Sequence, residues 1–102
     1  MRVLIVSVPD CPNRVLADGR VREALARVGL ESVEPEHRTV DSAEQALAEG
    51  FHGSPSIVID GLDPFADQTT PVGFGCRLYR TEAGLEGAPS VSQLEAAVRQ
   101  AL

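Results

Sequence analysis

The hydrophobic pattern along the chain changes its period several times, and each change predicts a new element. Val3 to Val8 is almost continuously apolar and rich in β-branched residues, which is typical of a strand covered on both faces. From Pro12 to Val28 the apolar residues recur every three or four positions, which predicts an amphipathic helix. Pro12 fits the first turn of this helix because its missing N–H would have no partner there. Gly29 is suited to cap the other end.

The middle of the chain predicts shorter elements. Ser32 to Val40 predicts a second strand, and Pro35 confines that strand to a sheet edge or a bulge. A capping box, Ser42-Ala43-Glu44-Gln45, begins a short helix that ends at Gly50. Ser56-Ile57-Val58-Ile59-Asp60 has an apolar, β-branched centre and predicts a third strand closed by the turn pair Asp60-Gly61.

The last part of the chain begins with a long loop. Leu62 to Gly75 is longer than most connections, which predicts a functional flap or a mobile segment. Cys76 to Arg80 predicts a fourth strand, and the capping box Ser90-Val91-Ser92-Gln93 begins a last helix. The predicted order over a single domain, residues 1–102, is β-α-β-α-β-β-α.

This order predicts the fold class. Alternating strands and helices imply parallel pairing, and a final β-β-α implies a hairpin covered by one more helix. The prediction is an α/β fold with a four-stranded mixed sheet and helices on both faces. A ferredoxin-like arrangement is the alternative, but it requires a hairpin in the middle of the chain and helices on one face only.

The charge balance narrows the function classes. Fifteen Asp and Glu against nine basic residues give a formal net charge of −6, which argues against binding to nucleic acid or to an anionic membrane. The longest apolar run, Val3 to Val6, is far shorter than the roughly 20 residues that span a bilayer. Met1-Arg2 leads directly into a predicted strand, so no signal peptide is expected. Two cysteines do not make a disulfide scaffold, and a cytoplasmic, reduced setting is therefore predicted.

Cys11 is the strongest candidate for chemistry. It lies where the first strand gives way to the first helix, and the unpaired N–H groups and dipole of a helix N-terminus favour a thiolate. Arg14 adds a positive charge, while Asp10 opposes it. Because the thiolate is the nucleophile, this placement predicts a functional thiol. The alternative is a buried cysteine that acts as a small hydrophobe.

The predicted element order, Cys11 at the first strand-to-helix turn and Ser54-Pro55 before the third strand resemble the thioredoxin-like superfamily over most of the chain. The resemblance implies a cis Ser54-Pro55 bond, with the proline beside the reactive sulfur. It also implies that the Ser54 backbone pairs with an extended thiol substrate. The residues assigned to substrate binding on this basis are Pro12, Asn13, Arg14, Ser54 and Pro55.

The chain also departs from the dithiol members of that superfamily. Arg14 stands where their second cysteine would be, so a local Cys-x-x-Cys disulfide is impossible, and Asp10 replaces a common aromatic residue. A redox cycle would need a glutathione or protein thiol, or the distant Cys76. No cofactor is predicted. His37 and His52 could complete four zinc ligands with the cysteines by count, but their spacing supports no preformed metal site.

A narrower resemblance is to short thioredoxin-like proteins labelled alkylmercury lyase-like. It implies that Cys11 and Cys76 hold mercury while Asp10 or Asp63 delivers a proton to carbon. Soft thiolates suit soft metals. The segments that carry this resemblance are Asp10-Cys11-Pro12-Asn13, Gly53-Ser54-Pro55, Asp60-Gly61, Asp63-Pro64-Phe65 and Gly75-Cys76-Arg77-Leu78-Tyr79.

The position of Cys76 depends on how the predicted third and fourth strands pair. In an antiparallel hairpin, Cys76 starts opposite Asp60, roughly 15 Å from the Cys11 end of the sheet. A disulfide needs Cα atoms within about 7 Å, so the two cysteines could pair only if the 62–75 loop folded back. The alternative for Cys76 is a structural thiol, while Arg77 and Arg80 are predicted to form a solvated face.

Together these residues predict a monothiol thiol–disulfide oxidoreductase with Cys11 as catalytic nucleophile and Cys76 as a second catalytic candidate. The expected partner is a thiol or disulfide substrate, either glutathione or a protein. Two alternatives remain open: a thiol-based module that binds a peptide or soft metal without turnover, and an organomercurial lyase.

Overall fold

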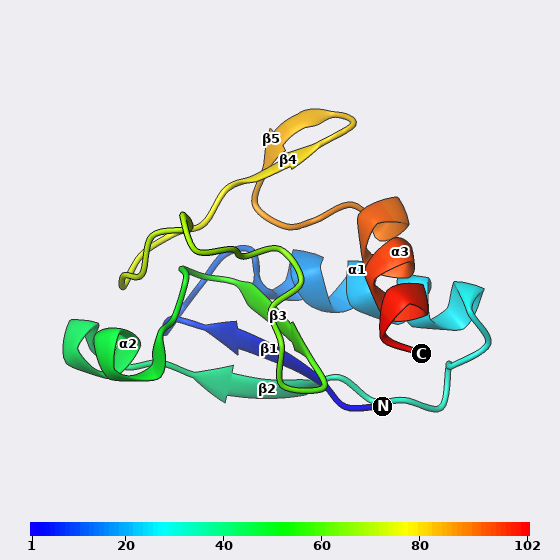
Figure 1. Ribbon diagram of the computed structural model, residues 1–102, viewed down its shortest axis with the longest axis horizontal. Coiled ribbons are helices and arrows are strands. Elements are labelled where there is room, and N and C mark those ends of the chain that lie inside the picture. The colour runs from blue at the N-terminus through cyan, green and yellow to red at the C-terminus, as the bar shows by residue number, and fades with distance from the viewer.

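The chain folds into three helices and five strands, and the strands form two separate sheets (Figure 1). The structure is a computed structural model that describes all residues from 1 to 102. In chain order the elements are β1 (Val3–Ser7), α1 (Arg14–Arg27), β2 (Glu36–Thr39), α2 (Ala43–Glu49), β3 (Ser56–Ile59), β4 (Tyr79–Thr81), β5 (Gly84–Glu86) and α3 (Val91–Ala101). None of the helices is long and apolar enough to cross a membrane.

The main sheet has three strands in the order β2-β1-β3. β2 lies at an edge, directly after Pro35, and runs parallel to β1. β3 runs antiparallel to β1, with Val6 opposite Ser56, although the alternation of elements implied parallel pairing. The start of β3 therefore lies at the end of β1 from which the chain continues to Cys11.

The prediction of a four-stranded sheet is wrong. After β3 the chain turns back at once, and the Ile59 N–H donates to the Leu62 carbonyl (2.7 Å), which occupies the outer edge of β3 at this end. β4 instead pairs with β5, a strand that the sequence analysis missed, with Arg80 opposite Leu85. In Figure 1 this hairpin stands clear of the main sheet.

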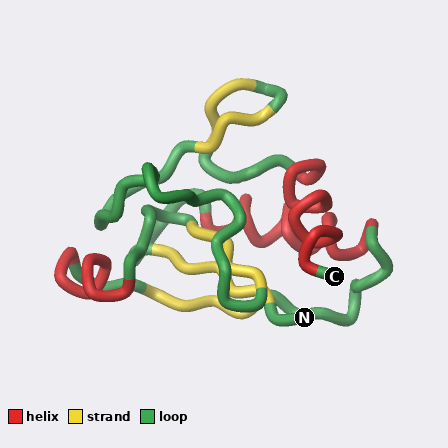
Figure 2. Tube along the Cα trace, in the orientation of Figure 1, coloured by secondary structure: helices red, strands yellow, loops and turns green.

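The helices cover the two faces of the main sheet unequally. α1 and α3 pack together over one face and form the larger core, while α2 lies at one end of the sheet (Figure 2). The larger core consists of Val3, Ile5, Ala17, Val21, Ala24, Leu25, Ile57, Ile59, Ala88, Leu94 and Val98. A smaller cluster on the other face consists of Val6, Val40, Ala46 and Phe51. Helices were expected on both faces of the sheet. On the α2 side, however, a helix covers only one end.

Two of the three predicted helix starts agree with the structure, and the third differs. Ser42 and Ser90 cap α2 and α3 as predicted, each accepting a hydrogen bond from the backbone three residues later. α1, however, begins at Arg14 rather than Pro12, and Asn13 is its N-cap without a side-chain hydrogen bond. Pro12 therefore lies in the turn before the helix, where its lack of a backbone N–H is tolerated equally well.

Candidate functional site

The segment before β3 joins several parts of the molecule. The Ser54-Pro55 bond is cis, in agreement with the resemblance noted above. Ser54 is fully buried, and its Oγ accepts a hydrogen bond from the Val8 backbone N–H (3.0 Å) in the connection between β1 and α1. The Tyr79 hydroxyl donates to the Pro55 carbonyl (2.5 Å). Because the side chains of Ser54 and Pro55 are buried, neither is open to a ligand.

The main chain of Ser54 is also occupied. Its N–H donates to the Gly75 carbonyl (2.7 Å), and its carbonyl accepts from the Arg77 N–H (2.9 Å). These two bonds form a parallel bridge between Ser54 and Cys76. The groups that were expected to pair with an extended substrate are therefore used by the chain itself.

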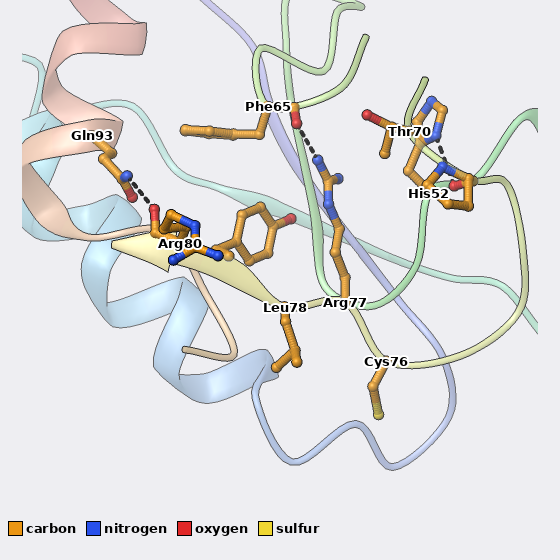
Figure 3. Close-up of a pocket in the computed structure, with 10 residues that line it drawn as sticks. His52, Phe65, Thr70, Cys76, Arg77, Leu78, Arg80 and Gln93 are labelled. Carbon is orange, nitrogen blue, oxygen red and sulfur yellow. Dashed lines mark hydrogen bonds between the residues drawn. The ribbon is translucent and has the colours of Figure 1, made fainter. Parts of the chain in front are cut away.

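Cys76 consequently lies at the Cys11 end of the sheet. Paired positions on bridged strands are separated by about 5 Å, so Cys76 is adjacent to Ser54. The predicted separation of roughly 15 Å from this end is wrong because β3 and β4 form no hairpin. Both cysteines are free thiols, and Cys76 is exposed. In Figure 3 its side chain points away from the neighbouring Arg77 side chain.

Cys11 is half-buried in the turn that precedes α1. Its N–H donates to the Val8 carbonyl (3.3 Å), and its carbonyl accepts from the Arg14 N–H (3.3 Å). It lines a cavity of about 330 Å³, together with Asp10, Arg14 and Thr39. Because α1 begins at Arg14, Cys11 lies outside the first helical turn, and the helix dipole acts on it less than predicted.

The other predicted binding residues near Cys11 differ in exposure. Pro12 and Arg14 are exposed, so both can meet a ligand. Asn13 is half-buried and packs against Gly87, where a Cβ atom would lie 2.3 Å from the Asn13 Cγ. Asn13 is therefore held by the loop that leads into α3.

Arg77 lies in the interior of the protein, contrary to the prediction. Its predicted position on a solvated face is wrong: the residue is 7% exposed. Its guanidinium donates to Asp63 Oδ2 (2.7 Å), to the Phe65 carbonyl (2.7 Å) and to Ser56 Oγ (3.2 Å). Asp63 and Phe65 thus anchor the start of the 62–75 loop.

The same interactions affect Tyr79. The Arg77 guanidinium carbon lies 4.6 Å from the centre of the Tyr79 ring, and Phe65 meets that ring edge-on. Burial raises the pKa of the Tyr79 phenol well above its ordinary value, Arg77 opposes this shift, and Asp63 adds to it.

A strand-like alternation explains why Arg77 is buried while Arg80 is exposed. Along this segment the buried residues are Arg77, Tyr79 and Thr81. The exposed residues are Cys76, Leu78 and Arg80. Residues 77 and 80 therefore lie on opposite faces, and a period of two in the sequence is the signal that could have separated them.

A cavity of about 470 Å³ opens beside Cys76 (Figure 3). Its lining includes His52, Thr70, Leu78, Arg80 and Gln93, and it contains no Asp or Glu. It shares no lining residue with the cavity at Cys11. The two thiols therefore reach solvent through separate openings.

The residues considered for zinc do not converge. His37 contacts Asp18 (2.7 Å between Nε2 and Oδ1), whereas the His52 ring faces the Pro71 carbonyl (3.2 Å). Nowhere in the chain do three His, Cys, Asp or Glu side chains gather in a way that could hold a metal ion.

The fold and the site together define a small α/β protein with two free thiols at one end of its main sheet. No family model, curated protein or solved structure matches the chain. The relationship to the thioredoxin-like superfamily thus stays a prediction from the residues quoted above.

Proposed function

We propose that this protein carries out thiol–disulfide exchange, with Cys11 as the attacking thiol. The observation that supports this most is that Ser54 is hydrogen-bonded to both segments that carry a thiol. Its Oγ holds Val8, three residues before Cys11, and its backbone holds the residues on either side of Cys76. Cys11 is half-buried and opens to solvent through its own cavity, so a disulfide substrate can reach it.

The proposed reaction conserves the number of disulfide bonds. The Cys11 thiolate attacks one sulfur of a disulfide RS–SR, a Cys11–S–S–R bond forms, and RS⁻ leaves and takes a proton from water. A second thiolate then attacks the R sulfur of this mixed disulfide, forms a new disulfide with R and releases Cys11. The second thiol is supplied by glutathione or a protein.

Two opposite charges lie in the cavity at Cys11. Arg14 lines the same cavity, carries a positive charge and has no carboxylate partner elsewhere in the chain. Asp10 lines that cavity as well and carries a negative charge. Substituting Asp10 by asparagine should therefore speed the attack.

The exchange reaction is tested on a Cys76→Ser chain, in which Cys11 is the only thiol. Bis(2-hydroxyethyl) disulfide is a neutral probe, and mass spectrometry follows the mixed disulfide over time. We expect Cys11 to react several-fold faster than the cysteine of an unstructured peptide at the same pH. A rate at or below that of the peptide contradicts the proposal and leaves a binding or structural thiol.

Organomercurial cleavage is the second candidate because the chain offers two soft ligands near one sheet end. Of the two acids considered, Asp63 is held by Arg77, so the proton would come from Asp10. Incubation of the native chain with methylmercury and excess thiol decides this point. Release of methane supports cleavage, whereas recovery of intact methylmercury on the protein supports binding without turnover.

A further inference from the structure

The arginines of this chain are almost all neutralised. Every basic residue except the histidines is an arginine, nine in total, and seven of them form ion pairs with a carboxylate. The paired residues are Arg2, Arg20, Arg22, Arg27, Arg38, Arg77 and Arg99. The two without such a partner, Arg14 and Arg80, each line a cavity that contains a cysteine.

The cavity at Cys76 differs in charge from the rest of the molecule. The chain has fifteen acidic residues and a net charge of −6, yet none of the acidic residues lines this cavity. Arg77 also lines it, but Asp63 neutralises that guanidinium, so Arg80 is the free cation. The volume of about 470 Å³ lies within the range of small-molecule sites.

The exposed face of the β4 segment orders three groups along a line. Cys76, Leu78 and Arg80 occupy alternate positions, and neighbouring members of such a row are about 6.6 Å apart. In Figure 3, Cys76 and Leu78 point to one side, whereas Arg77 points the other way toward the Phe65 carbonyl. A ligand that matches this row has a sulfur, a short apolar linker and an anionic group.

The occupied backbone of Ser54 favours a small ligand over a peptide. An extended peptide would need the N–H and carbonyl of Ser54, but both are bonded within the chain to Gly75 and Arg77. A small ligand can enter the cavity beside Cys76 without breaking these bonds.

We propose that the cavity beside Cys76 binds a low-molecular-weight disulfide or thiol that carries a carboxylate, and that Arg80 pairs with this carboxylate. The proposal goes beyond the exchange proposed for Cys11, because it assigns a second reactive thiol and the class of ligand that this thiol takes. The Cys76 thiolate attacks one sulfur of RS–SR, Cys76–S–S–R forms, and RS⁻ leaves and is protonated by water. The number of disulfide bonds is unchanged, so no further oxidant is required.

The test uses a Cys11→Ser chain, in which Cys76 is the only thiol, and three disulfides of similar size. These are 3,3′-dithiodipropionate (anionic), bis(2-hydroxyethyl) disulfide (neutral) and cystamine (cationic). Relative to an unstructured cysteine peptide, we expect Cys76 to favour the anionic over the neutral reagent by about two- to fivefold, which corresponds to an exposed ion pair. Cystamine should react more slowly than the neutral reagent, and added salt should reduce both differences.

Two further substitutions in the Cys11→Ser chain separate a local charge from the overall charge. Arg80→Gln should lower the ratio of the anionic to the neutral rate to that of the unstructured peptide. Arg99→Gln alters the net charge equally but lies on α3 and is paired with Glu95, so it should retain the preference. Equal reagent ratios in these two variants, or no preference in the parent, overturn the proposal. The exchange proposed for Cys11 is tested separately in the Cys76→Ser chain. Failure of the Cys76 proposal therefore does not decide the Cys11 proposal, and the reverse also holds.

Discussion

The guanidinium of Arg77 shows how a single charged side chain can organise the region around the thiols. It is the only charged residue in the chain that is buried, and its contacts come from three parts of the fold: β3, the start of the 62–75 loop and the Tyr79 ring. A buried charge is tolerated only while its partners remain in place. The carboxylate of Asp63 is therefore essential to this arrangement.

Asp63→Asn should lower the free energy of unfolding by about 3 kcal/mol, because it leaves the Arg77 charge buried without an anionic partner. Urea denaturation monitored by circular dichroism measures the change. Glu95→Gln is the matched control, since Glu95 pairs with Arg27 and Arg99, which are both exposed, and the expected cost is below about 1 kcal/mol. A comparable cost for the two variants would contradict the structural role assigned to the buried pair.

At the residue level, the sequence predicted features that depend on local spacing. The placement of Cys11 between a strand and a helix belongs to this group, whereas the cis bond at Ser54-Pro55 was implied by the family resemblance alone. The neighbours of Cys76 and Arg77 do not, because they depend on how segments distant in the sequence pair. The assumed hairpin moved Cys76 to the wrong end of the sheet and turned Arg77 toward solvent.

At the scale of elements, the turn before α1 packs directly against the loop before α3. Asn13 is the N-cap of α1, makes no side-chain capping bond, and lies against Gly87. A Cβ atom at position 87 would lie 2.3 Å from the Asn13 Cγ, so it has no room unless Asn13 moves. This contact connects the α3 loop to the turn that carries Cys11.

Gly87→Ala should therefore displace Asn13, destabilise the chain by about 1 kcal/mol and change the alkylation rate of Cys11. Asn13→Ala creates space and removes no capping bond, so the double variant should recover most of the stability and the native rate. Unfolding in urea and iodoacetamide labelling of the Cys76→Ser chain provide the two readouts. Additive effects of the two substitutions would show that the contact carries no such coupling.

The sequence predicted elements well where a side chain sets the boundary. Ser42 and Ser90 cap the helices that were expected to follow them. The start of α1 was misplaced because proline fits both the first helical turn and the turn before it. β5 was missed because Gly84–Glu86 is too short for a periodic pattern, and without it β4 was assigned to the main sheet.

For the molecule as a whole, the composition makes the change in the free energy of unfolding above neutral pH simple to interpret. The chain has no lysine and one tyrosine, and its arginines stay charged at any pH that leaves the chain intact. Apart from the two thiols and the α-amino group, Tyr79 is therefore the group whose ionisation matters above neutral pH. Burial raises its pKa in the folded state, so the neutral phenol stabilises the fold.

The unfolded chain loses its tyrosine proton near pH 10, before the folded chain does, so stability should fall as the pH rises above that value. The expected loss attributable to Tyr79 is about 1.4 kcal/mol at pH 11. Tyr79→Phe should be less stable near neutrality by about 1 kcal/mol, because its hydrogen bond to Pro55 is lost. It should also decline less between pH 9 and pH 11. Urea unfolding at both pH values checks this, and equal declines in the two proteins would contradict it.

The joint packing of α1 and α3 has a consequence for synthesis on the ribosome. β1 and α1 are made before α3, but the apolar side chains of α1 complete their core with Leu94 and Val98 of α3. The nascent chain must therefore expose that apolar stripe until α3 has been translated. A premature stop before α3 would leave the stripe uncovered and would direct the product toward chaperones or aggregation instead of a smaller folded protein.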